Sequence, residues 1–237
     1  MTEPWYTSDF YSDIEAGCVR SAEVVVPLVH VAVEPESVID VGCGTGAWAA
    51  AFARHGARVA HGVDGSWVPR ERLLIPPGDF YVADIAGTDP LAGLTHRAHY
   101  DLAVCLEVAE HLRCDQAATL IGNLVALAPV VLFSAAIPGQ GGVGHINEQW
   151  LDHWQALFDQ HDYQLFDIVR AVLWDDERVE AWYIQNIVLF AGPDADRARL
   201  ADVERRRGRL PLRLVHPRVF ENSIERWSGD RTEEALQ

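Results

Sequence analysis

The chain has 237 residues, of which 49% are hydrophobic, and this composition suits one folded domain with additions while excluding a disordered protein. Its formal net charge of −16 makes long nucleic acids and anionic membranes poor partners, because an acidic surface repels phosphate groups. The four cysteines have no CxxC spacing, and the N-terminus lacks the basic and then apolar segment of a signal peptide. Both observations favour a reduced, cytoplasmic protein. We find no apolar run of the roughly 18–20 residues that a membrane span requires.

Short apolar runs alternate with longer amphipathic segments along the first two thirds of the chain. The runs are typical of buried strands and cover residues 37–42, 58–64, 79–84, 101–107 and 130–138. Helix-like segments cover residues 45–55, 67–74, 108–128 and 148–161. This alternation predicts an α/β fold with a doubly wound, mostly parallel sheet.

The pattern changes after residue 161. Two apolar segments, 163–174 and 180–192, are separated only by a short acidic turn. Strands joined by so short a link run antiparallel, so we predict a seven-stranded sheet that ends in an antiparallel hairpin. Eight arginines follow between residues 197 and 218. We expect a charged helix at about 194–207, followed by an extended segment. The charges are better explained as a solvated helix face than as an anion-binding site.

A glycine-rich turn follows the first predicted strand. The sequence VIDVGCGTG places Asp40 near the end of the strand and Gly42, Gly44 and Gly46 before the next helix. Glycines at such a turn let a ligand approach the backbone closely, and the helix N-terminus offers unpaired N–H groups. Many nucleotide-binding folds share such a turn, so it indicates a particular ligand only in combination with further motifs.

Two further acids end the next two predicted strands. Asp64 lies 18 residues after Gly46, where a carboxylate can hold the hydroxyls of a ribose. Asp84 is followed by Ile85, a pair that can accept a hydrogen bond from an adenine amino group and flank its ring. Either acid alone is also explained as a helix cap or turn residue. Together with the glycine turn, they predict a nucleoside-containing cofactor.

With these motifs, the sequence over about residues 20–192 resembles the class I S-adenosylmethionine-dependent methyltransferases. The spacing is G-x-G-x-G, an acid stands two residues earlier, and the predicted sheet is that of the family. The resemblance implies S-adenosyl-L-methionine as cofactor, with Asp40 and the three glycines around its amino-acid part, Asp64 at the ribose, and Asp84 with Ile85 at the adenine. An NAD-dependent dehydrogenase of similar fold and a binding module without catalysis are the alternatives.

Four ionisable residues are predicted to meet beside this cofactor. Glu107 ends the fourth strand, Glu110 and His111 follow it, and His145 lies in a long loop beyond the fifth strand. The carboxyl ends of neighbouring parallel strands open on one crevice, so the four side chains can approach one another. Two carboxylates and two imidazoles suit a divalent metal such as Mg, Mn or Zn, with positions left for substrate oxygens.

This E-x-x-E-H pattern with a later histidine is similar to the metal site of two groups in the superfamily, the small-RNA terminal 2′-O-methyltransferases and the ubiquinone-pathway O-methyltransferases. The similarity implies Glu107, Glu110, His111 and His145 as metal ligands. Two alternatives stay open. The motif also occurs in methyltransferases without metal, where the first glutamate lies by the cofactor and the E-H pair packs or caps the next helix. A catalytic role without metal would make His111 or His145 the general base.

The remaining predictions concern the acceptor side. The resemblance divides the chain into an N-terminal lid or helix (1–30), a cofactor-binding domain (31–192) and an arginine-rich extension (193–237). Aromatic residues mark the lid: Trp5, Tyr6, Phe10 and Tyr11. We expect the glycine-rich loop 139–144 to close over the substrate, and Trp150 and Trp154 to line a pocket or to join the core. The predicted reaction is methyl transfer to a hydroxyl of a small molecule, with metal-free N-methylation as the alternative.

Overall fold

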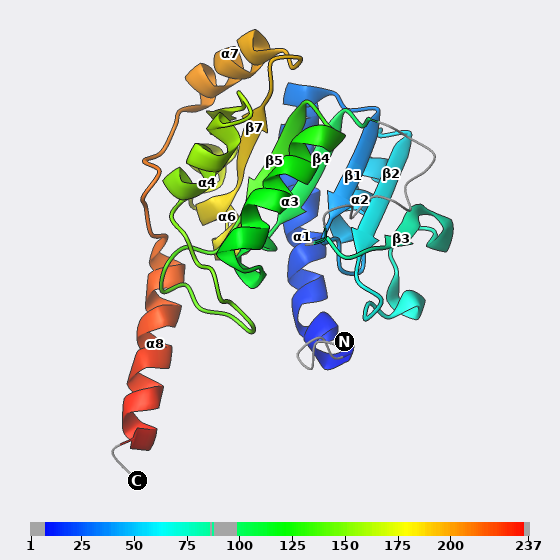
Figure 1. Ribbon diagram of the computed structural model, residues 1–237. Coiled ribbons are helices and arrows are strands. Elements are labelled where there is room, and N and C mark those ends of the chain that lie inside the picture. The colour runs from blue at the N-terminus through cyan, green and yellow to red at the C-terminus, as the bar shows by residue number, and fades with distance from the viewer. Residues whose placement is uncertain (1–7, 86, 88–98, 235–237) are drawn as a thin grey trace.

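The computed structural model describes residues 8–85, 87 and 99–234, and the side chains of residues 15–226 within these ranges. A seven-stranded sheet has the strand order β3-β2-β1-β4-β5-β7-β6 (Figure 1). The strands are β1 (Ser37–Val41), β2 (Val59–Asp64), β3 (Phe80–Val82), β4 (Leu102–Leu106), β5 (Val130–Ser134), β6 (Gln164–Phe166) and β7 (Val188–Ala191). Strands β1 to β5 pair in parallel, and β7 lies antiparallel between β5 and β6. The predicted fold class is confirmed.

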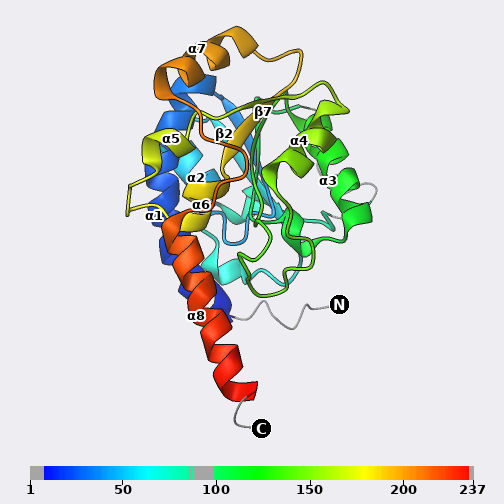
Figure 2. The ribbon, with the colours of Figure 1, turned by 90° about the vertical axis from the view of Figure 1, so that its left-hand side faces the viewer.

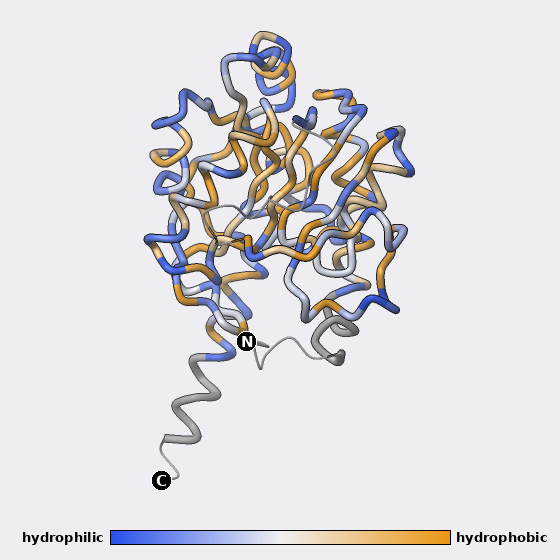
Figure 3. The backbone as a smooth tube through the Cα atoms, turned by 45° about the vertical axis from the view of Figure 1, so that its right-hand side comes forward, coloured by the Kyte–Doolittle hydropathy of each residue, from blue (hydrophilic) through white to orange (hydrophobic). Residues whose placement is uncertain are grey.

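Helices cover both faces of this sheet (Figure 2). They are α1 (Ser8–Val33), α2 (Ala47–Arg54), α3 (Cys114–Leu127), α4 (Leu151–Asp159), α5 (Arg170–Leu173), α6 (Ala181–Asn186), α7 (Arg197–Arg207) and α8 (Pro217–Glu234). Alternate strand residues point to opposite faces, so Leu102 packs with α1 and α2 while Ala103 packs with α3 and α4. Because both faces are buried, the central strands are mostly apolar, as the hydropathy colouring of Figure 3 also shows.

The predicted helices and hairpin need two corrections. The expected helix at 67–74 contains only a short 3-10 turn, Arg70–Arg72. The two long strands expected at 163–174 and 180–192 are short, because β6 ends at Phe166 and α5 and α6 precede β7. The cause is local: the buried carboxylate of Asp167 accepts a hydrogen bond from the backbone N–H of Arg170 at 3.2 Å, which favours a helix start over continued extension.

Helix α1 differs from what we expected of the N-terminal segment. Its residues Glu15–Val33 are long and apolar enough to span a membrane by length and composition, contrary to our expectation that no such run exists. One face of this helix is buried against α2 and the sheet, with Ala22, Val25 and Val29 inaccessible to solvent. The lid residues Trp5 and Tyr6 lie outside the described residues, as do the side chains of Phe10 and Tyr11.

The C-terminal extension docks on the domain through its arginines. The predicted charged helix is α7, but the segment after it continues into α8, which the sequence analysis missed. All eight arginines between 197 and 218 contact a carboxylate or a backbone carbonyl, as in the bonds from Arg207 to Leu28 O and Ile168 O. Five of these arginines contact residues outside the extension and attach it to the domain, namely Arg197, Arg199, Arg207, Arg213 and Arg218. Arg205, Arg206 and Arg209 pair with acids of α7 itself, and the largely exposed side chains of Arg205 and Arg206 form the expected solvated face.

Candidate active site

A cavity of about 1650 Å³ lies at the carboxyl ends of β1, β2 and β4. It is lined by most of the residues that the sequence singled out, namely Asp40, Gly42, Gly44, Asp64, Asp84, Ile85, Glu107, His111 and His145. Two predicted residues are not part of its wall: Gly46 and the fully buried Glu110. Trp154 belongs to the core beside Phe133, and neither it nor Trp150 lines the cavity.

The glycine turn keeps its shape because its residues adopt backbone angles that favour glycine. Gly42 has φ +78°, and a Cβ there would lie 2.4 Å from the Cγ2 atom of Val108. Gly44 has φ +53° and donates its N–H to the Oδ2 atom of Asp64 at 2.7 Å. Gly46, with φ +86°, is the N-cap of α2, so its role is in the turn rather than in the cavity wall.

Asp40 is a buried acid beneath this turn. Its side chain is 2% exposed, and its Oδ2 atom has no hydrogen-bond partner. Burial, with a smaller contribution from the charge of Asp64, raises the pKa of Asp40 to about 8, although a backbone N–H at Ala49 partly favours the ionised form. An unpaired buried carboxyl at a cavity is suited to a cationic ligand group.

The acids after β2 and β3 lie on the same cavity. Both oxygens of Asp64 accept backbone hydrogen bonds, from Gly44 at 2.7 Å and from Gly65 at 2.6 Å, and burial raises the pKa of Asp64. Each carboxylate oxygen still has a second lone pair for a ligand hydroxyl. Asp84 and Ile85 line the wall beyond β3.

Glu107 is held by a set of amides that the sequence analysis missed. Its φ of +56° is rare for a residue other than glycine. Its Oε2 atom accepts from the amide of Gln140 at 3.0 Å and its Oε1 atom from that of Asn186 at 3.3 Å. Burial is the main cause that raises the pKa of Glu107 to about 7. No motif marked these amides, because neutral side chains carry no spacing signature of their own.

Three of the four predicted metal ligands come together. Glu110, His111 and His145 each offer a ligand atom, and these atoms all lie within 4.8 Å of one another. The backbone brings them there, since the carbonyl of Glu110 accepts N–H bonds from Ile146 at 2.9 Å and Asn147 at 3.0 Å. Glu107 is not in this group, because the amides described above hold its carboxyl.

The electrostatics of this cluster are unusual. Glu110 is completely buried, and neither of its carboxyl oxygens makes a well-formed hydrogen bond. Burial and the neighbouring charge of Glu107 raise the pKa of Glu110 well above its ordinary value. Burial and then the nearby His145 lower the pKa of His111 to about 4, so that its imidazole is neutral. A buried, unpaired carboxyl beside two imidazoles fits a divalent cation, which would remove the cost of the unpaired oxygens.

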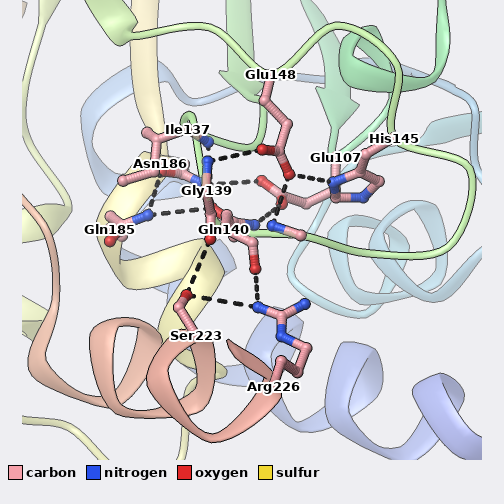
Figure 4. A network of polar contacts seen from close by, with 11 residues as sticks. Glu107, Ile137, Gly139, Gln140, His145, Glu148, Gln185, Asn186, Ser223 and Arg226 are labelled. Atoms are coloured by element: carbon pink, nitrogen blue, oxygen red, sulfur yellow. Dashed lines mark hydrogen bonds and ion pairs between the residues drawn. The ribbon is translucent and has the colours of Figure 1, made fainter. Parts of the chain in front are cut away.

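The far wall of the cavity comes from segments after residue 180. Trp182 and Tyr183 of α6 line it, together with Val219, Asn222 and Arg226 of α8. Arg226 donates to the carbonyl of Gln140, and Ser223 donates to that of Gly139 at 3.0 Å (Figure 4). The C-terminal extension is therefore a structural part of the site, which its composition did not reveal.

Comparisons with known proteins agree with this geometry. A family model described as a methyltransferase domain matches residues 21–172. A search of curated protein sequences found no match. A candidate O-methyltransferase from Nostoc punctiforme is structurally similar, with a TM-score of 0.55 and 15% identity over 79% of this chain and 59% of that one. The present chain thus spans less than two thirds of that protein.

Two further solved structures have the same fold. The small RNA methyltransferase HEN1 has a TM-score of 0.51 and 18% identity over 74% of this chain and 25% of that one. The magnesium protoporphyrin IX methyltransferase from Synechocystis, solved with bound S-adenosylmethionine, has a TM-score of 0.50 and 19% identity over 78% of this chain and 83% of that one. At these identities, the likenesses show the fold alone.

Proposed function

The chain belongs to the class I S-adenosylmethionine-dependent methyltransferases, and from this premise we propose that it methylates a hydroxyl of a small molecule with the help of a divalent metal. The observation that carries the proposal is the buried, unpaired carboxyl of Glu110 beside His111 and His145. Membership of this family overturns the alternative of an NAD-dependent dehydrogenase. The cofactor of the methyltransferase family is S-adenosylmethionine.

The cavity residues suit the parts of this cofactor. The unpaired oxygen of Asp40 would face the ammonium of the amino-acid part, where the positive φ of Gly42 and Gly44 opens the backbone. The carboxylate of Asp64 would receive the ribose hydroxyls, and Asp84 with Ile85 would hold the adenine. Glu107 would lie between the cofactor and the acceptor.

Methyl transfer requires that the acceptor oxygen be positioned in line with the methyl group and that the acceptor hydroxyl lose its proton. The carbon–sulfur bond of the sulfonium breaks as the acceptor oxygen forms a bond to the methyl carbon, and S-adenosylhomocysteine leaves as a neutral thioether. A metal held by Glu110, His111 and His145 would supply Lewis acidity that favours ionisation of the hydroxyl. Burial weakens the basicity of His111, so that in metal-free catalysis the general base would be His145.

The proposed acceptor is a small molecule in a cytoplasmic setting. The net charge of −16 opposes binding of a long polyanion, and the acceptor side is a walled cavity rather than an open basic groove. The cysteines at 18, 43, 105 and 114 are free thiols, which suits a reducing compartment. We propose that a lid or helix (1–30) and the extension (193–237) flank the domain (31–192), because Cys18 of α1 and Asn222 of α8 both line the cavity.

Metal binding tests the central part of this proposal. We expect purified protein to bind Zn²⁺ or Mn²⁺ saturably in calorimetry, and Glu110→Gln to weaken that binding on the order of 100-fold or more, because it removes the charged ligand. The exposed Glu177→Gln variant is the control and should bind metal as the native protein does. Undiminished metal binding by Glu110→Gln, or none by the native protein, would contradict the metal-assisted function.

Cofactor binding is expected to release protons through Asp40. With a pKa of about 8, Asp40 is mostly protonated at pH 7 in the free protein, and a nearby ligand cation favours its ionised form. Titration with S-adenosylhomocysteine at pH 7 in buffers of different ionisation enthalpy should show release of about one proton. Affinity should rise with pH until about pH 8. Asp40→Asn should abolish the release, whereas Asp152→Asn, which alters a 39% exposed side chain outside the cavity wall, should retain it.

The same shift predicts how stability depends on pH without ligand. Because the folded-state pKa of Asp40 is raised, the folded protein binds more protons than the unfolded chain between about pH 4 and pH 8, and stability falls as pH rises through this window. Asp40→Asn should flatten that slope in denaturant unfolding curves. An unchanged slope would show that Asp40 is not the group responsible.

A further inference from the structure

One carboxylate organises the loop that carries His145. The Oε2 atom of Glu148 accepts the backbone N–H of Gly139 at 2.8 Å, and its Oε1 atom accepts that of Gly141 at 2.6 Å. The Oε1 atom also lies 3.0 Å from the Nδ1 atom of His145 (Figure 4). A single side chain thus links two of the four glycines of the loop, Gly139 and Gly141, to the imidazole.

The imidazole is enclosed on several sides. The side chains of His145 and Glu148 are 12% and 19% exposed, so water competes little for their hydrogen bond. The ring of His111 packs edge-on at 4.9 Å. A Cβ atom at Gly142 would lie 2.3 Å from the Nε2 atom of His145, so only glycine leaves this nitrogen uncrowded. The ring is therefore held at Nδ1 by Glu148, while Nε2 stays uncrowded.

The chemistry of this contact fixes the proton on the ring. A carboxylate can only accept, so a neutral His145 must carry its hydrogen on Nδ1. The lone pair then lies on Nε2, the nitrogen that remains for a metal or for an acceptor proton. Without such a partner, solvent and the remaining contacts would determine the relative populations of the two tautomers.

We infer that Glu148 is a positioning residue for methyl transfer, which holds His145 as the Nδ1–H tautomer and leaves Nε2 to act in the site. The inference rests on the proposed role of His145 in the reaction. Residues of α8 support the same loop, since Ser223 and Arg226 donate to the carbonyls of Gly139 and Gln140. Glu148 acts through His145 and does not itself line the cavity.

The tautomer can be read directly in the metal-free full chain. Long-range ¹H–¹⁵N correlation spectra of protein labelled at its 10 histidines, recorded at about pH 8.5 where neutral imidazoles dominate, distinguish Nδ1–H from Nε2–H. His145→Gln assigns the signal. We expect the native protein to show Nδ1–H, Glu148→Gln to keep it through the amide oxygen, and Glu148→Ala to move most of the population to Nε2–H.

The controls separate this role from a purely structural one. Glu221→Ala removes an exposed carboxylate from α8 and should leave the His145 signal unchanged. A native Nε2–H tautomer, or an unaltered Nδ1–H tautomer in Glu148→Ala, would overturn the inference. Because Glu148→Gln keeps an acceptor for the loop, it remains informative even if Glu148→Ala fails to fold. The tautomer is read without metal, so a failure of metal binding would contradict the proposed function and leave this result intact.

Discussion

Replacing Arg170 with methionine is expected to lower the free energy of unfolding by about 3–5 kcal/mol. The guanidinium is 1% exposed and binds the equally buried carboxylate of Asp167 through Nε at 3.1 Å and Nη2 at 2.8 Å. Its remaining N–H groups reach the carbonyls of Gln185, Leu210 and Pro211. The substitution would leave a buried charge and three carbonyls, of which that of Gln185 belongs to a buried residue, without their partner.

Chemical denaturation measures this loss, and limited proteolysis shows where it acts. Because two of the orphaned carbonyls belong to the segment after α7, we expect faster cleavage between residues 208 and 216 in Arg170→Met. Adding Asp167→Asn should recover part of the stability, since it removes the unpaired charge. Arg213→Met is the matched control, because its 65% exposed side chain pairs with Asp152 at the surface and should cost under about 1 kcal/mol. A loss of under about 1 kcal/mol in Arg170→Met, as small as that expected for the control, would contradict the prediction.

The strand ends were predictable because a strong local signal marks them. Asp40, Asp64 and Glu107 each end an apolar run that is too short for a helix, and parallel strands bring such ends to one edge. The structure places all three on one cavity. The mostly parallel sheet with its antiparallel end was predictable from the alternation of segments, and the cofactor class followed from the family resemblance.

The acceptor side was less predictable because distant residues form it. Gln140 and Asn186 hold Glu107, although 46 residues separate the two amides and neither belongs to a charged motif. The buried guanidinium of Arg170 joins segments about 40 residues apart through the carbonyls of Leu210 and Pro211, and helix α5 begins at this residue where a strand was expected. Helix α8 was missed because its charged composition resembles a solvated tail, and only the tertiary contacts of Ser223 and Arg226 connect it with the site.

Part of the cavity wall lies outside the segment that matches the methyltransferase family. The methyltransferase family match ends at residue 172, yet Trp182 of α6 and Val219 of α8 form the far wall of the cavity. The proposed cofactor residues therefore lie within the matched region, whereas Trp182 and Val219 lie beyond it. In the proposed function, the shared domain would hold the cofactor and the segments beyond it would select the acceptor.

Gly42→Ala is expected to weaken S-adenosylhomocysteine binding by at least about 100-fold, which corresponds to roughly 2.7 kcal/mol. An alanine at φ +78° is strained by about 1–2 kcal/mol, and its Cβ would lie 2.4 Å from Val108 Cγ2. The turn must therefore shift, although the N–H of Gly42 is bonded to the carbonyl of Val63 at 2.8 Å. That shift displaces the backbone on which the amino-acid part of the cofactor would rest.

Calorimetric titration with S-adenosylhomocysteine tests this requirement for glycine, and Gly122→Ala is the matched control. Gly122 lies inside α3, and a Cβ atom there would meet open space, so alanine should stabilise the helix by about 0.5–1 kcal/mol and leave binding unchanged. Near-native affinity in Gly42→Ala would show that the turn can yield without disturbing the cofactor. Loss of affinity in Gly42→Ala alone, with both proteins still fully folded at the temperature of the titration, would place the effect in the turn rather than in the fold.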